Sequence, residues 1–184
     1  MPKYLRFRVE LMSISPRISR TFLIGTGASF AELHDAIQTA GPWASEHSYY
    51  FGRPKEGRPL IEPDGDDMSA GVLVAESCPV LAFFRNPQNS TAIYVYDLGG
   101  CWKHSVTLEA QTVERDRFKR RLIAGTRAFP KEGMNGISEY RECVAIAQGK
   151  ASDTARTRNR LRWLRGWDPE FFDLEIQRES FDRR

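Results

Sequence analysis

The feature that most constrains the fold is a pair of alternating apolar runs that meet at a glycine-rich turn. Residues 93–96 form the first run, and residues 102–108 return with an apolar or aromatic side chain at most alternate positions. Gly99 and Gly100 lie between the two runs. Because glycine reaches the positive φ values of tight hairpin turns, the pattern predicts an antiparallel hairpin with its turn at these glycines.

Patterns elsewhere in the chain predict further strands, with helices between and after them. Ser29 followed by Glu32 predicts a capping box, and Gly41 and Pro42 end the helix that it begins. Strands are expected over residues 4–12, 18–25, 47–53, 72–75 and 80–84, a long loop over 53–70, and helices over 138–148 and 153–165. Ser138 and Asp153 are the expected caps of the last two helices, and residues 178–184 are expected to fray. With no regular β-α-β alternation, the order favours an α+β fold with a mixed, mostly antiparallel sheet packed by helices.

The chain of 184 residues fits a single domain, with a core over residues 1–150 and a C-terminal helical extension over residues 151–184. A hydrophobic content of 41% and a charged content of 28% are those of an ordinary soluble protein. No apolar run approaches the length of a membrane span, and the N-terminus lacks the apolar core of a signal peptide. A cytoplasmic location without membrane contact is therefore expected.

Four separated motifs occur in a characteristic order. They are L-H-D-x-I-Q from Leu33, W-x-x-x-H from Trp43, Y-D-L-G-x-x-W-x-H from Tyr96 and W-x-P-x-x-F-D from Trp167. This ordered set resembles the plasmid pRiA4b ORF-3-like family, which occurs on plasmids, near mobile elements and in many prokaryotic chromosomes. The resemblance covers residues 4–179 and implies a single α+β domain, without implying a particular reaction.

The chain also departs from the pattern of that family. Ser19 replaces a tryptophan, and Gly100 replaces an aspartate in the hairpin turn. The P-P-E-D run of the family reads P-K-E-G from Pro130. Two acidic side chains that a metal or acid–base site would use are therefore missing.

Six residues in the family-like blocks are the candidate site cluster: His34, His47, Asp97, Trp102, His104 and Glu132. Imidazoles and a carboxylate suit zinc or another divalent metal, so one hypothesis is a metal-dependent hydrolase with the three histidines as ligands. In this hypothesis Glu132 acts as acid or base. The alternative is structural, because histidines often form hydrogen bonds within cores, and His104 is then expected to pair with Asp97 and fix the turn.

Two segments concentrate cations: Arg117, Lys119, Arg120 and Arg121 in the first, and Arg156, Arg158, Arg160, Arg162 and Arg165 in the second. Together they would form a basic surface suited to phosphates, and the alternative for the second segment is a solvated helix face that pairs with local acids such as Asp168 and Glu170. The leading hypothesis is a non-catalytic binding module without a cofactor, acting on nucleic acid or a protein partner. Whether the protein is an enzyme, and its oligomeric state, stay open at this point.

Overall fold

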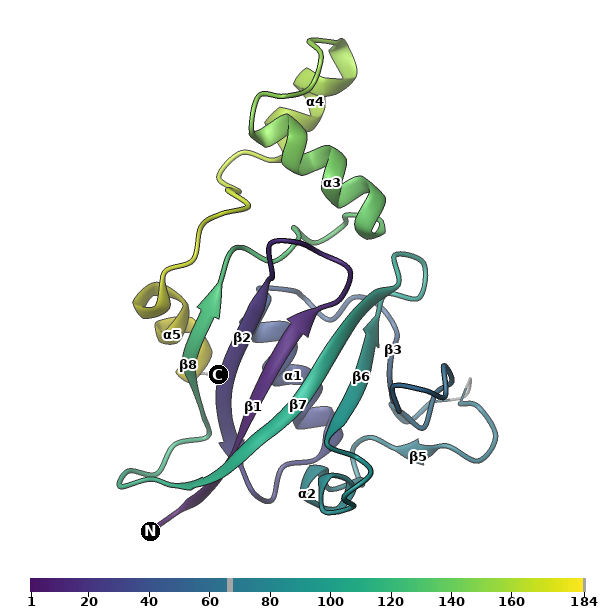
Figure 1. Ribbon diagram of the computed structural model, residues 1–184, viewed down its shortest axis with the longest axis vertical. Helices are drawn as coiled ribbons and strands as arrows, with labels where there is room; N and C mark the ends of the chain where they lie inside the picture. Colours follow the sequence, from purple (N-terminus) through teal and green to yellow (C-terminus); the bar gives the residue numbers. More distant parts are fainter. Residues whose placement is uncertain (66–67, 184) are drawn as a thin grey trace.

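The protein is an α+β domain built on one eight-stranded mixed sheet, seen in a computed structural model that describes residues 1–65 and 68–183 (Figure 1). The strands are β1 (Lys3–Leu11), β2 (Ser19–Gly25), β3 (Tyr49–Gly52), β4 (Ile61–Glu62), β5 (Leu73–Val74), β6 (Thr91–Tyr96), β7 (Trp102–Val113) and β8 (Arg120–Thr126). The helices are α1 (Phe30–Ala40), α2 (Val80–Phe84), α3 (Gly136–Ala147), α4 (Ala155–Trp163) and α5 (Leu174–Asp182). The predicted fold class is confirmed.

The sheet runs in the order β5-β4-β3-β6-β7-β1-β2-β8, and among the described residues only the β4–β5 pair is parallel. On one face, every second side chain of β1 is buried beneath α1, including Leu5, Phe7 and Val9. Leu33 and Ile37 of α1 are fully buried in the same core. Each such side chain contributes about 1.5–3 kcal/mol through burial. In Figure 1, α1 lies behind the sheet, and the opposite face of the sheet is toward the viewer.

The start of α1 is built as the sequence predicts. The Ser29 hydroxyl accepts a hydrogen bond from the Glu32 N–H, and the Glu32 carboxylate accepts one from the Ser29 N–H. Gly41 ends the helix with its N–H bonded to the Ile37 carbonyl. These reciprocal bonds satisfy donors that a helix start otherwise leaves open.

The central hairpin is confirmed, but the positive φ values of its turn do not fall on its two glycines. Strands β6 and β7 pair with Tyr94 opposite His104, and the positive φ values fall on Asp97 (55°) and Cys101 (52°). Gly100 lets the turn pack closely, since a Cβ there would lie 2.6 Å from Asp97 Oδ2 and 3.1 Å from the Gly136 nitrogen. Asp97 Oδ1 accepts the Gly99 N–H, as expected of an aspartate in a turn.

Four local predictions were wrong. Residues 80–84 were expected to form a strand but form the helix α2 after Pro79. The prediction failed because a run of five apolar residues fits a short helix as well as a strand. Helix α3 begins two residues earlier than expected, and Thr154 rather than Asp153 caps α4. The loop expected over residues 53–70 contains β4, and its residues 66–67 lie outside the described residues.

The C-terminal segment, expected to fray over residues 178–184, instead continues helix α5 to Asp182 and docks on the core through one side chain. Phe181 of α5 is fully buried and packs 5.5 Å from the Phe22 ring of β2, centroid to centroid. Arg120 of β8 also donates to the Phe181 carbonyl. A single apolar residue among polar ones gave too weak a signal to predict this docking. In the described ranges, no helix is both long and apolar enough to cross a membrane.

Candidate functional site

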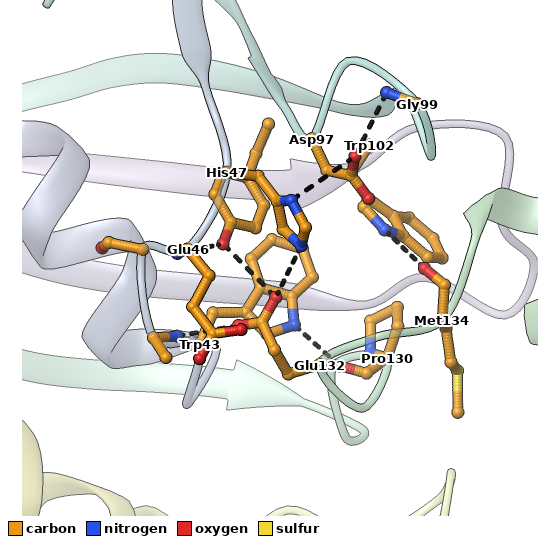
Figure 2. A network of polar contacts seen from close by, with 12 residues as sticks. Trp43, Glu46, His47, Asp97, Gly99, Trp102, Pro130, Glu132 and Met134 are labelled. Carbon is orange, nitrogen blue, oxygen red and sulfur yellow. Dashed lines mark hydrogen bonds and ion pairs between the residues drawn. The ribbon is translucent and has the colours of Figure 1, made fainter.

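Residues 129–136, here called the strap, connect β8 to α3 and are held by three tryptophans. Each indole N–H donates to one backbone carbonyl of the strap: Trp43 to Pro130 (2.8 Å), Trp102 to Met134 (3.2 Å) and Trp167 to Phe129 (2.8 Å). Figure 2 shows the first two of these bonds. Segments distant in sequence therefore converge on the strap, and buried carbonyls that would otherwise be unsatisfied find donors.

Glu132 fixes the middle of the strap. Its carboxylate accepts the Ala44 N–H at 2.7 Å and the Tyr96 hydroxyl at 3.3 Å. The Tyr96 hydroxyl in turn accepts the Glu46 N–H at 3.0 Å. Burial and the nearby negative charge of Glu132 raise the pKa of Tyr96 to about 12, so this phenol stays protonated as a donor at neutral pH.

His47 lies between two carboxylates and is partly exposed. Its Nδ1 is 4.0 Å from Asp97 Oδ1, and its Nε2 is 4.0 Å from Glu132 Oε1 (Figure 2). Because the two carboxylates face different ring nitrogens, they cannot share one metal ion with a single nitrogen of His47. The arrangement instead places one imidazole between the hairpin turn and the strap.

His34 is buried at a separate point, within the helix-covered face. Its ring stacks on Tyr49 with 3.6 Å between centroids, and its Nδ1 lies 2.8 Å from the Tyr94 hydroxyl. The amide of Gln38 donates to the same hydroxyl. Burial lowers the pKa of His34 to about 4, so the ring is neutral at neutral pH.

His104 is fully buried in the core and does not pair with Asp97 as expected. Its Nδ1 lies 3.4 Å from the Tyr94 carbonyl, and its ring meets Trp43 edge-on at 5.5 Å between centroids. Burial lowers the pKa of His104 to about 4. The pairing fails because His104 points into the core, whereas Asp97 lies in the turn beyond the strand end, beside His47.

The structure therefore brings His47, Asp97 and Glu132 together, bonds the Trp102 indole to the strap that carries Glu132, and leaves His34 and His104 elsewhere in the core. Across residues 1–65 and 68–183, no group of three or more His, Cys, Asp or Glu side chains is placed to hold a metal ion. The hydrolase hypothesis requires the three histidines to converge on one metal ion, and in the described part of the chain they do not. The three indole bonds to the strap, here called the tryptophan clamp, were not predicted from the sequence. The three tryptophans that make them nevertheless lie in the family-like motifs.

The two basic segments do not form one surface. The β7–β8 connection lies at the same end of the molecule as the N-terminus, and α4 lies at the opposite end (Figure 1). Arg120 is 5% exposed and its guanidinium is held by the Phe181 carbonyl, while Arg121 covers the Phe118 ring at 4.0 Å. The two basic segments do not combine into one surface because β8 runs along the sheet between them.

The second basic segment lies on helix α4 and, for Arg165, just after its end, in an arm that stands away from the sheet with α3 (Figure 1). Three of its arginines pair with carboxylates: Arg156 with Glu142 (3.1 Å), Arg158 with Asp153 (2.7 Å) and Arg160 with Glu139. Arg162 and Arg165 have no carboxylate within ion-pair distance among the described residues. These two arginines, Arg158 and the half-exposed Leu161 line a hollow on the solvent side of the helix.

The molecule is thus an α+β protein with one sheet face covered by helices and an arginine-rich helical arm joined to it through a clamped strap. The chain belongs to the plasmid pRiA4b ORF-3-like protein family, whose model matches residues 3–176. It is 26% identical to the uncharacterised protein y4hQ of Sinorhizobium fredii over 160 residues, which cover 86% of this chain and 79% of that protein. The crystal structure of MM3350, a protein of unknown function from Methanosarcina mazei Go1, matches with a TM-score of 0.82 and 26% identity, covering 96% of this chain and 98% of MM3350.

Proposed function

We propose that this protein is a non-catalytic binding module that holds a polyanion, of the nucleic-acid class, on the arginine-rich arm. The observation that carries the proposal is the hollow on α4, where Arg158, Arg162 and Arg165 surround Leu161. An apolar centre with guanidinium groups around it suits a phosphate backbone whose sugars contact the leucine. Guanidinium groups bind phosphate oxygens through two parallel hydrogen bonds, which an ammonium cannot do.

The charges on the arm are available to such a ligand. Arg162 and Arg165 have no carboxylate to displace among the described residues. The Arg158–Asp153 pair is largely exposed, with side chains 56% and 77% accessible. Exposed pairs contribute at most about 1 kcal/mol, so a phosphate can replace the carboxylate at little cost.

The base of the arm is fixed to the strap. Lys131 lies 4.9 Å from the centroid of the Trp163 ring and donates to the Trp163 carbonyl. Arg160 lies 5.0 Å from the same centroid and pairs with Glu139 of α3. An arm held in this way presents its arginines in one arrangement before the ligand arrives, which lowers the entropy lost on binding.

Filter binding of labelled duplex DNA, single-stranded DNA and RNA at low and moderate salt tests the proposal. We expect retention that falls steeply with salt, because each neutralised phosphate releases counterions. The double variant Arg162→Gln/Arg165→Gln should lose most of that retention, and Arg117→Gln, at the far end of the molecule, should keep it. Retention of none of the three nucleic acids at low salt would contradict the proposal.

A further inference from the structure

The sheet face that α1 does not cover contains a second hollow, far along the chain from α4. Tyr50 of β3 pairs with Val95 of β6, and Val95 pairs with Lys103 of β7, so the three side chains form a row on one face. Across the two strand spacings the row spans about 10 Å. Tyr50 is partly exposed and Lys103 exposed at either end.

A loop turns back over the sheet and completes the wall of this hollow. Leu60 donates to the Phe51 carbonyl, and the Arg58 carbonyl oxygen lies 2.6 Å from where a Cβ on Gly52 would stand. Glycine at position 52 is therefore what allows the loop to approach. Arg53 and Arg58, at the two ends of this loop, line the hollow together with Tyr50, Ile93 and Lys103.

The rim of the hollow has an excess of positive charge. Arg53 and Arg58 share a single carboxylate, Glu56, at 2.8 and 3.7 Å. Lys103 has no carboxylate within ion-pair distance in the ranges that the structure describes. Three cations against one anion favour an anionic ligand, and the aromatic and aliphatic floor favours a flat apolar part of that ligand.

We propose that this hollow binds a nucleotide, with the base against the Tyr50 ring and the phosphate on the cationic rim formed by Lys103 and the 53–58 loop. The base supplies the flat apolar part, and the phosphate supplies the anion. The ligand is either a free nucleotide or one nucleotide of a single strand. The single-strand case rests on the proposed function, and the free-nucleotide case does not.

Isothermal titration with a nucleoside monophosphate, with the corresponding nucleoside and with ribose 5-phosphate separates the two parts of the ligand. We expect the monophosphate to bind more tightly than either fragment. Tyr50→Leu should weaken binding about tenfold, the effect of losing one base–aromatic stack. Tyr50→Phe should bind like the wild type, and Lys103→Gln should weaken the monophosphate but not the nucleoside. Lys3→Gln, an exposed lysine on β1 outside the hollow, is the matched control.

A short single-stranded oligonucleotide is titrated in parallel, into the wild type and into Arg162→Gln/Arg165→Gln. Binding of the monophosphate assigns the site to free nucleotides, and Tyr50-dependent binding of the oligonucleotide alone assigns it to a strand. Because the α4 variant leaves the hollow intact, monophosphate binding that survives in it separates this site from the proposed function. If neither ligand binds, or if Tyr50→Leu and Lys103→Gln both leave binding unchanged, the inference is wrong.

Discussion

Acidification should destabilise this protein through its two buried histidines. The pKa of His34 and that of His104 both fall from 6.5 to about 4 because burial penalises the charged ring. Between these values the unfolded chain binds more protons than the folded one, so stability falls as the pH drops from about 6.5 toward 4. At about pH 5 each histidine costs about 2 kcal/mol relative to neutral pH, and the pair costs about 4 kcal/mol. That is a large part of the 5–15 kcal/mol that typically holds a domain together.

Urea denaturation at about pH 5 and about pH 7.5 measures this difference, since carboxylates titrate mostly below the window. The variants His34→Asn and His104→Asn keep an amide near the position of Nδ1 but cannot titrate. Each should be less stable than the wild type at the higher pH and should show a pH dependence smaller by about 2 kcal/mol. If the double variant kept the full pH dependence of the wild type, the assignment of acid sensitivity to these histidines would be refuted.

Two further predictions concern the strap. Trp43→Phe removes the donor to the Pro130 carbonyl and should lower the free energy of unfolding by about 1–3 kcal/mol in urea; an effect no larger than that of Trp163→Phe would argue against the clamp. Gly136→Ala should destabilise more than Gly149→Ala in thermal melts. Both glycines have positive φ, but only at Gly136 would a Cβ meet another backbone, 2.7 Å from the Gly100 carbonyl oxygen. Equal losses would show that this close approach is not needed.

The sequence predicted most of the regular structure, because local patterns determine it. Alternation of apolar residues identified β1 and β2, and the Ser29–Glu32 pair placed the start of α1 correctly. Short apolar runs carry less information, and residues 80–84 illustrate this limit. Their five residues satisfy a strand and a helix equally, and in the structure they form a helix with Pro79 at its N-cap.

The arrangement of the site was harder to predict, because it depends on contacts between distant segments. His47, Asp97 and Glu132 were each singled out, yet only the fold shows that His47 rather than His104 lies beside Asp97. The orientation of a strand decides which face a histidine occupies, and a one-residue change of register reverses it. The clamp likewise consists of bonds from tryptophans to backbone carbonyls. Since every residue has such a carbonyl, the sequence does not show which ones accept these bonds.

The charge on α4 shows a second limit of the sequence. Pairing with local acids was one of the two alternatives, but the sequence did not show which arginines pair: three of them face carboxylates of neighbouring segments. Which cations stay available is a property of packing. Arg162 and Arg165 are distinguished from Arg156 only by the surroundings of each side chain.

The central claim is that Arg162 and Arg165, which pair with no carboxylate among the described residues, bind a polyanion, and a salt titration tests it most directly. Fluorescence anisotropy with a labelled duplex gives the affinity of the wild type, Arg162→Gln/Arg165→Gln, and Arg156→Gln as a control in the same helix whose side chain does not line the hollow. We predict that the double variant binds more weakly and that its log–log salt slope is shallower by about 2, since each lost phosphate contact removes about 0.9. The Arg156→Gln slope should change by less than half of that amount. Equal affinity and equal slope in wild type and double variant would contradict the account.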